Sequence, residues 1–396
     1  MSSAETLSDT IAVEWLDDGI RVYGRTVELE SKGGCVVEPI NLADFEALAA
    51  GRMPPAAWDY YRSGCDDERT LQANCDAFAR LQLRPRVLVD VSHISLATTA
   101  LGAEVRAPLL VAPTAYHGLA HVEGECETAR GASAAGSLMV VSTLANRPLE
   151  DVATAATCPL WFQLYVYRDR GISEQLVRRA EAAGYRALVL TVDTARLGRR
   201  ERDIRNGFGL PPHLHVGNFA GEAREQPGQE PGSSGLAVYA AAQLDSSLTW
   251  EALDWLRSVT TLPVVVKGIL TAEDAALAVE HGAAGIIVSN HGGRQLESGL
   301  ATIEALPEVV AAVAGGCEVY MDGGIRRGTD ALKALALGAQ AVLLGRPILW
   351  GLVASGQAGV ARVLDLLTLE LELAMALVGA PSLDALTPAL LRYRGF

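Results

Sequence analysis

Polar side chains able to do chemistry gather in SNHGGRQL, residues 289–296, directly after an apolar run that begins at Ala284. A neutral histidine can accept a proton, and an arginine can grip a carboxylate through two parallel hydrogen bonds. Asp193 ends another apolar run, ALVLTVD, where a carboxylate can orient an imidazole. His291 alone would more often be a structural histidine. Together with Asp193 and Arg294 it predicts a general base, an orienting carboxylate and an anion-binding guanidinium.

Further charged residues stand at comparable positions. Lys267 ends the apolar run PVVVK, where an unpaired ammonium would be costly, so it faces either a negative ligand or an internal salt-bridge partner. Arg200, in TARLGRRERD, belongs either to a surface charge run or to a second carboxylate-binding group. DGGIRRGTD and LGRP combine glycines with Arg326 and Arg346, which is typical of a phosphate site.

Eight short apolar runs must position these residues, and Ala-rich amphipathic segments alternate with them. The runs begin at Leu109, Leu138, Leu160, Tyr185, Pro263, Ala284, Glu318 and Ala341. Continuous apolar strands that alternate with helices predict a parallel sheet covered on both faces, which is the α/β class. Eight units predict a closed (β/α)8 TIM barrel rather than an open doubly wound sheet, with the strand ends facing the active-site mouth.

Two regions interrupt the alternation. Residues 209–243 are long, polar and rich in Gly and Pro, which predicts a lid-like insert after the fourth strand. Residues 41–78 predict a helical segment before the barrel. Residues 10–30 alternate apolar and polar side chains around an Asp-Gly pair, which indicates a small hairpin. We therefore expect an N-terminal extension over 1–38, to which no role is assigned, and one catalytic domain over 39–396.

Composition narrows the classes of partner. The chain has 396 residues and a formal charge of −14, which argues against nucleic acid and against an anionic membrane surface. Its apolar runs are shorter than the roughly 20 residues that a membrane span needs, and the N-terminus does not resemble a secretory signal. Six cysteines without a C-x-x-C pair predict neither a metal site nor a disulfide framework. We expect a cytoplasmic protein.

The segments DYYRSGCDDERTLQAN, APTAYHGLAHVEGE, QLYVYRDR, LTVDTARLGRRERDIRN, VKGILTAEDA, VSNHGGRQL, DGGIRRGTD and LGRP, taken in this order, resemble the FMN-dependent α-hydroxy-acid oxidase family. The resemblance runs from about Asn41 nearly to the C-terminus, and S-N-H-G-[AG]-R-Q is among the most specific signatures of the family. It implies that His291 is the catalytic base and Asp193 its partner. It also implies that Arg294 and Arg200 bind the substrate carboxylate, assisted by the hydroxyls of Tyr60 and Tyr165.

The resemblance implies FMN as cofactor, with Lys267 beside the N1/O2 edge of the ring and Ala115 near N5. The other contacts implied for the ring, the ribityl chain and the phosphate are Pro113, Thr114, Ser142, Gln163, Thr191, Ser289, Asp322, Gly324, Arg326, Gly345 and Arg346. His291 would remove a proton while two electrons pass from a 2-hydroxy acid to FMN. The same residues serve a route through carbon and a route through hydride transfer.

The resemblance also bears on the substrate and the electron acceptor. Alanine at Ala115, where some dehydrogenases of the family have glycine, favours molecular oxygen as acceptor, with hydrogen peroxide as second product. Leu144 replaces a bulky tryptophan of the plant glycolate oxidases, and Tyr116 and Tyr167 can supply an aromatic wall. The pattern is similar to mandelate and 4-hydroxymandelate oxidases, so we expect an aromatic (S)-2-hydroxy acid. Family members are often tetramers or octamers, and we expect a homo-oligomer.

Several alternatives remain at this stage. One is a lactate-type or long-chain 2-hydroxy-acid oxidase or dehydrogenase, which oxygen consumption and dye reduction would distinguish. Another is an FMN-dependent isomerase, which would not need His291 and Arg294 to handle a carboxylate. The most remote is a flavin-binding barrel without catalysis, which predicts a broken catalytic set.

Overall fold

The computed structural model describes residues 13–16, 19–22, 38–219 and 232–394. Residues up to Ile40 and residues from Asn41 onward form separate compact units, and each is described by itself. In the first unit, β1 (Val13–Leu16) and β2 (Gly19–Val22) pair antiparallel, with Val13 opposite Val22. The Asp-Gly pair expected to form the turn lies partly outside the described residues. The boundary of the extension stays a prediction.

The second unit is built on a closed barrel of eight parallel strands, which confirms the predicted (β/α)8 class. The strands are β6 (Leu109–Val111), β7 (Met139–Ser142), β8 (Leu160–Leu164), β9 (Ala187–Thr191), β10 (Val264–Ile269), β11 (Gly285–Val288), β12 (Glu318–Asp322) and β13 (Ala341–Leu344). Each lies in one of the eight apolar runs. Pairing of β13 with β6 closes the barrel, with Leu343 opposite Leu110.

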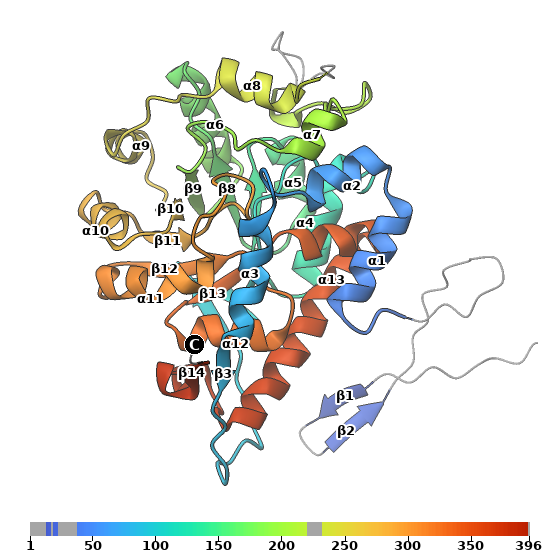
Figure 1. Ribbon diagram of the computed structural model, residues 1–396, viewed down its shortest axis with the longest axis vertical. Coiled ribbons are helices and arrows are strands. Elements are labelled where there is room, and N and C mark those ends of the chain that lie inside the picture. The colour runs from blue at the N-terminus through green and yellow to red at the C-terminus, as the bar shows by residue number, and fades with distance from the viewer. Residues whose placement is uncertain (1–12, 17–18, 23–37, 220–231, 395–396) are drawn as a thin grey trace, which may run out of the picture. The chain divides into compact units, whose positions relative to one another are not determined.

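A ring of helices surrounds the barrel, as Figure 1 shows. They are α4 (Gly124–Ala134), α5 (Leu149–Ala155), α6 (Arg170–Ala182), α9 (Glu251–Val259), α10 (Ala272–Glu280), α11 (Thr302–Val313), α12 (Gly328–Ala336) and α13 (Arg346–Val378). Side-chain caps begin some of them: Thr271 Oγ1 accepts from the Asp274 amide of α10, and Asp169 accepts from the Gly171 amide of α6. In the described part of the chain, no helix is both long and apolar enough to cross a membrane.

Three helices precede the barrel: α1 (Leu42–Arg52), α2 (Pro55–Arg62) and α3 (Arg69–Ala79). Asn41 caps α1 by accepting from the amides of Ala43 (2.8 Å) and Asp44 (3.1 Å). Two further helices, α7 (Glu201–Arg205) and α8 (Gly235–Gln243), lie between β9 and α9. The predicted insert therefore contains a helix that its Gly and Pro content did not indicate. Short antiparallel pairs join β3 (Leu81–Leu83) to β14 (Leu391–Tyr393), and β4 (Thr98–Ala100) to β5 (Ala103–Val105).

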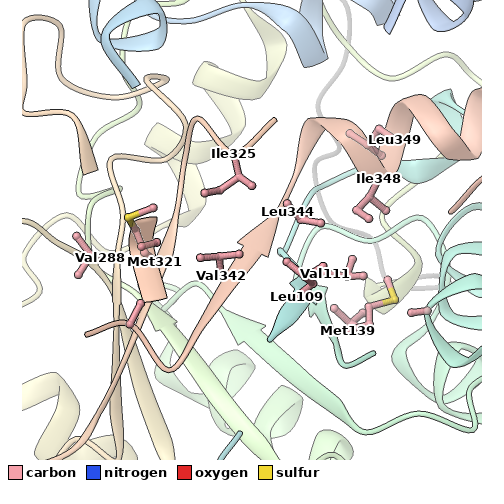
Figure 2. Packing of buried hydrophobic residues seen from close by; sticks show 14 of the residues in the cluster. Leu109, Val111, Met139, Val288, Met321, Ile325, Val342, Leu344, Ile348 and Leu349 are labelled. Atoms are coloured by element: carbon pink, nitrogen blue, oxygen red, sulfur yellow. The ribbon is translucent and has the colours of Figure 1, made fainter. Parts of the chain in front are cut away.

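The strands separate two apolar layers because successive side chains of a strand point to opposite faces. Alternate residues fill the barrel, among them Trp161 and Tyr320, whose rings meet edge to face with centroids 5.4 Å apart. Ala103 and Val105 of β5 belong to the same interior cluster. The other residues face the helices; Figure 2 shows part of this layer, including Val342 of β13 and Ile348 at the start of α13. Both faces of each strand are buried, which explains the continuous apolar runs.

The barrel interior gives a first prediction. Ile287 is fully buried in the interior cluster, so Ile287→Ala should lower the free energy of unfolding by about 2–5 kcal/mol and Ile287→Val by about 0.5–1.5 kcal/mol. Guanidinium unfolding followed by circular dichroism measures both. Val122→Ala is the control, because Val122 is 78% exposed and lies outside the barrel interior. An equal loss in Ile287→Ala and Val122→Ala would contradict the packing of the barrel interior.

Candidate active site

A cavity that is open to solvent lies at the carboxyl ends of the barrel strands. Most of the residues expected to bind substrate or cofactor line it. They are Tyr60, Pro113, Thr114, Ala115, Ser142, Leu144, Tyr165, Arg200, Lys267, His291, Arg294, Asp322, Gly324, Arg326, Gly345 and Arg346. Every barrel strand, or the loop that follows it, therefore contributes to one mouth, where α2 also contributes. The contribution of β9 comes from the loop that follows it and not from the strand itself.

Three expected contacts lie beneath this surface. Gln163 accepts from Ser142 Oγ (3.2 Å) and donates to Thr191 Oγ1 (3.0 Å). Ser289 Oγ accepts from Lys267 Nζ at 2.9 Å. Gln163, Thr191 and Ser289 are all buried and do not line the cavity. They connect the strand ends β7, β8, β9, β10 and β11 beneath the residues that line the mouth.

His291 and Asp193 form the expected pair. His291 Nδ1 lies 3.0 Å and 3.2 Å from the two carboxylate oxygens of Asp193. Burial is the largest influence on His291 and lowers its pKa; Asp193 opposes this effect, and Lys267 adds to it. The pKa of Asp193 is lowered in spite of its burial, because His291 and Lys267 favour the carboxylate. With Nδ1 directed at a carboxylate, Nε2 is the ring nitrogen free to accept a proton.

The turn that carries His291 has an unusual backbone. His291 (φ +59°), Gly292 (φ +66°) and Gly293 (φ +74°) are all left-handed. Glycine is needed at 293, where a Cβ would lie 2.5 Å from the amide nitrogen of Leu71. A left-handed histidine is uncommon, and its conformation places the ring at the mouth instead of continuing β11. The strand therefore ends at Val288.

Two arginines expected to bind a carboxylate lie together. Arg200 Nε donates to the Arg294 carbonyl at 3.4 Å, and Arg294 Cζ lies 4.9 Å from the Tyr60 ring centroid. Burial, followed by repulsion from Arg200, lowers the pKa of Arg294 to about 10. Among the described residues, neither Arg200 nor Arg294 forms an ion pair with a carboxylate. An anionic ligand would relieve this repulsion.

The carboxyl end of α2 supports two of the buried cations. Arg294 Nη1 donates to the carbonyls of Tyr60 (2.5 Å) and Ser63 (2.9 Å). Arg346 donates from Nε to the Tyr61 carbonyl (2.8 Å) and from Nη2 to the Ser63 carbonyl (2.9 Å). The last carbonyls of a helix have no partner within it and lie at the negative end of its dipole. The helix thus stabilises both guanidinium groups, although it lies outside the barrel.

Lys267 and Asp322 form a buried ion pair beside these groups. Lys267 Nζ lies 3.3 Å from Asp322 Oδ2, and the two side chains are 4% and 10% exposed. Lys267 was expected to face either an internal salt-bridge partner or a negative ligand. It has the internal partner, and it also lines the cavity, where a ligand can reach it. The other oxygen, Asp322 Oδ1, is buried without a hydrogen-bond partner among the described residues. That oxygen can accept a hydrogen bond from a ligand.

A further pair of arginines gives the cavity a second cationic region. Arg326 lies with its Cζ 4.9 Å from the Trp350 ring centroid, and Arg346 stands at the start of α13. Burial, with repulsion from Arg294 and Arg326, lowers the pKa of Arg346 to about 9. These residues follow β12 and β13, as the phosphate-site interpretation requires.

The apolar lining comes largely from residues that the sequence did not indicate. Leu236, Tyr239 and Ala240 of α8 line the cavity, together with Leu197 and Leu244. Except for Leu197, they lie in or next to the insert that was expected to be polar. The signal for these residues in the sequence is the short run GLAVYAAAQL at its end.

The expected aromatic wall is only partly present at the surface of the cavity. Leu144 lines it, whereas Tyr116 and Tyr167 are fully buried and do not. Tyr116 packs behind Tyr60, with ring centroids 5.7 Å apart, and Tyr167 lies 3.0 Å from Tyr239, hydroxyl to hydroxyl. Each therefore supports a lining residue.

The loop after β11 is fastened to α3. Asn74 and Asn290 exchange two amide hydrogen bonds, each 2.8 Å long. Glu297 accepts from the amides of Arg69 (3.0 Å) and Thr70 (2.9 Å), which begin α3 without a side-chain cap of their own. These contacts with α3 hold the turn at His291 on the side away from Asp193.

No group of three or more side chains suited to a metal is present in the described part of the molecule.

The comparisons with known proteins agree with this geometry. The family model described as FMN-dependent dehydrogenase matches residues 49–393. The chain is 55% identical to an L-lactate oxidase of Nostoc sp. over 353 residues, which are 88% of this chain and 97% of the relative. It is 54% identical to glycolate oxidase 1 of Zea mays over 350 residues, 88% of this chain and 95% of the relative. A solved structure of mandelate oxidase with (S)-4-hydroxymandelic acid is similar at a TM-score of 0.85 and 46% identity, over 89% of this chain and 98% of that one.

The reciprocal amide pair gives a second prediction. Asn74→Ala removes both bonds and leaves the buried Asn290 side chain without this partner, which should cost about 1–3 kcal/mol of unfolding free energy. Urea unfolding measures the loss. Gln72→Ala is the control, because Gln72 bonds only at the surface of the same helix. A loss no larger than that of Gln72→Ala would show that the pair does not hold the loop.

Proposed function

The chain belongs to the family of FMN-dependent dehydrogenases, and on this basis we propose that it oxidises an aromatic (S)-2-hydroxy acid to the 2-oxo acid, with molecular oxygen as acceptor and hydrogen peroxide as second product. FMN is its cofactor, and oxidation of 2-hydroxy acids is its reaction class. The observation that carries the proposal is the His291–Asp193 pair beside the buried Arg200 and the half-buried Arg294, for which the described residues provide no carboxylate partner. Mandelate and 4-hydroxymandelate are the substrates we favour.

The residues present fit FMN. Asp322 Oδ1 is a buried acceptor to which the described residues donate no hydrogen bond, and it is suited to a hydroxyl of the ribityl chain. Lys267 offers a cation to the ring, and Arg326 and Arg346 offer cations to the phosphate. Ser142, Gln163, Thr191 and Ser289 would support the ring from below, with Pro113, Thr114, Ala115, Gly324 and Gly345 around it. Bound FMN supplies the acceptor for two electrons from the substrate.

The protein's own groups do the remaining work. Arg294 and Arg200 hold the substrate carboxylate, and the hydroxyls of Tyr60 and Tyr165 donate to its oxygens. Burial raises the pKa of both tyrosines, so they stay protonated donors. His291 Nε2 then accepts the substrate proton, and Asp193 stabilises the imidazolium that forms. In this proposal, the arginines bind the carboxylate, and His291 with Asp193 accepts the proton.

The aromatic substrate is supported by the apolar part of the cavity. Leu144 leaves space that a bulkier side chain would fill, and Leu236, Tyr239 and Ala240 offer apolar surface. The solved structure of mandelate oxidase with (S)-4-hydroxymandelic acid covers nearly the whole of this domain. A lactate- or glycolate-type oxidase is the second candidate, because relatives with those names are 55% and 54% identical to this chain.

We also propose a homo-oligomer and a cytoplasmic location. Leu369, Leu373 and Leu377 stand four residues apart on α13 and are 48%, 60% and 67% exposed, an apolar stripe that a second copy of the chain would cover. The five described cysteines, Cys65, Cys75, Cys126, Cys158 and Cys317, are all free thiols, as expected in a reducing compartment.

The substrate proposal predicts the outcome of an anaerobic bleaching experiment. The yellow protein is mixed with (S)-mandelate, (S)-4-hydroxymandelate, (S)-lactate or glycolate, and the loss of flavin absorbance is followed before air is readmitted. We expect fast bleaching by the aromatic acids and return of the colour with oxygen. Bleaching by the small acids alone would establish the second candidate. Failure of all four would contradict the catalytic assignment.

The base gives a pH prediction. His291 must be neutral to accept a proton, and its pKa is lowered, so the rate of flavin reduction should fall as the pH falls through a value below the ordinary 6.5.

The variant Asp193→Asn removes the group that raises the pKa of His291, so the acid limb of the pH–rate profile should move to still lower pH. The rate should also fall by about 10²–10⁴-fold, as it should in His291→Ala. Stopped-flow reduction from pH 5 to 9 measures both effects, with FMN content as the control for folding. An unchanged rate in His291→Ala would rule out its role.

A further inference from the structure

A second histidine, His117, lies next to the cavity and has no part in the reaction described above. It is 1% exposed and belongs to the short helix η1 (His117–Leu119), which follows the segment Pro113–Ala115. Both ring nitrogens are engaged. Nε2 lies 2.5 Å from Thr114 Oγ1, and Nδ1 lies 2.8 Å from Thr128 Oγ1. The imidazole therefore bridges a residue of the cavity wall and a residue of α4.

The backbone of His117 is held firmly. Glu125 is fully buried and accepts from the amides of His117 (3.0 Å), Asn146 (3.0 Å) and Arg147 (3.2 Å). The first bond fixes the backbone of His117 to α4, and the other two fix α4 to the loop after β7. Among the described residues, the partner of each threonine hydroxyl is His117, and neither hydroxyl bonds to the Glu125 carboxylate.

The ring is neutral at ordinary pH. Burial lowers the pKa of His117, while Glu125 and a hydrogen bond to the Thr114 backbone act in the opposite direction with smaller effect. A neutral imidazole has one N–H and one acceptor nitrogen. The two threonine hydroxyls must therefore play opposite parts, one donating to the ring and the other accepting from it.

The surroundings of Thr128 decide between the two arrangements. Its side chain is fully buried, and the described residues offer its hydroxyl only His117 Nδ1 as a hydrogen-bond partner. If Nδ1 carried the hydrogen, the hydroxyl hydrogen of Thr128 would have no acceptor, at a cost of about 1–3 kcal/mol. Donation from Thr128 to Nδ1 avoids this cost. The ring hydrogen then belongs on Nε2 and is donated to Thr114.

Thr114 is the residue that transmits this choice to the cavity. It lines the cavity, and within the described part of the chain its hydroxyl bonds only to His117. An oxygen that already accepts from Nε2–H keeps its own hydrogen for another partner. The opposite tautomer would consume that hydrogen and leave Thr114 with acceptor capacity only.

We propose that His117 is a positioning residue that makes the Thr114 hydroxyl a hydrogen-bond donor into the cavity, directed at an acceptor atom of bound FMN. The proposal rests on the function proposed above, because it requires FMN in this cavity. Reduction makes the flavin ring richer in electrons, so a donor to an acceptor atom of the ring stabilises the reduced form more than the oxidised form. His117 and Thr114 thereby help to set the midpoint potential of the cofactor.

The tautomer can be tested without any catalysis. Solid-state NMR of the holoenzyme with ¹³C,¹⁵N-labelled histidine distinguishes a protonated Nε2 from a protonated Nδ1, and His117→Gln identifies the signal. We expect protonated Nε2 and unprotonated Nδ1 for His117. Protonated Nδ1 with unprotonated Nε2 would overturn the proposal, whichever substrate the enzyme uses.

The effect on the cofactor is tested by its midpoint potential. Thr114→Val should lower the potential, and Thr114→Ser, which keeps the hydroxyl, should restore it. His117→Gln retains a side-chain N–H and should stay near the wild type, whereas His117→Leu should lower the potential. Thr114→Val should then have a smaller effect in the His117→Leu background than in the wild type. Equal shifts in both backgrounds would refute the coupling.

Failure of this proposal and failure of the proposed function are separable. FMN content and anaerobic bleaching by 2-hydroxy acids test the function, and they do not depend on the His117 tautomer. A protein that bleaches normally while Thr114→Val leaves the potential unchanged would retain its function and refute the role of His117.

Discussion

The clustering of several cations in one cavity is the constraint that the rest of the structure must satisfy. Lys267 is buried, Arg294 and Arg346 are half-buried, and a charge withdrawn from water without a partner is costly. Among the described residues, Asp322 is the one carboxylate that pairs with any of the three, at 3.3 Å from Lys267. The arginines depend instead on backbone carbonyls at the end of α2. Burial and repulsion from neighbouring arginines lower the pKa values of Arg294 and Arg346, which disposes the site to bind anions.

This constraint explains why elements outside the barrel are needed. The eight strands bring His291, Lys267 and the phosphate-site arginines to one mouth, where Arg294 and Arg346 take carbonyl partners from outside the barrel. Helix α2 supplies them. Helix α3 fastens the loop after β11 through Asn74 and through the cap that Glu297 provides. The left-handed turn at His291 is held from both sides, by Asp193 in the site and by α3 behind it.

The barrel and most of the cavity lining were predictable because their signals are local. A strand buried on both faces is a continuous apolar run, and the polar residue that ends it is found by reading to the end of the run. The carbonyl contacts of α2 have no such signal, because every residue has a carbonyl and the contact joins positions more than 200 residues apart. Tyr116 shows the same limit. It is adjacent to the predicted wall in sequence, but its left-handed backbone turns the ring behind Tyr60.

The division of the cavity into a charged part and an apolar part accounts for its mixed similarities. In the proposed function, the groups that hold a carboxylate and accept a proton serve any 2-hydroxy acid, so relatives that are named for lactate, glycolate and mandelate could share them. The apolar lining at Leu144 and along α8 is the surface that we propose discriminates among substrates. A methylene more or less in an apolar pocket changes selectivity by only about 1–3 kcal/mol, so identity over the whole chain says little about this surface. The proposed substrate choice therefore depends on a few side chains, namely Leu144 after β7 and the lining residues of α8 in an insert that the barrel itself does not require.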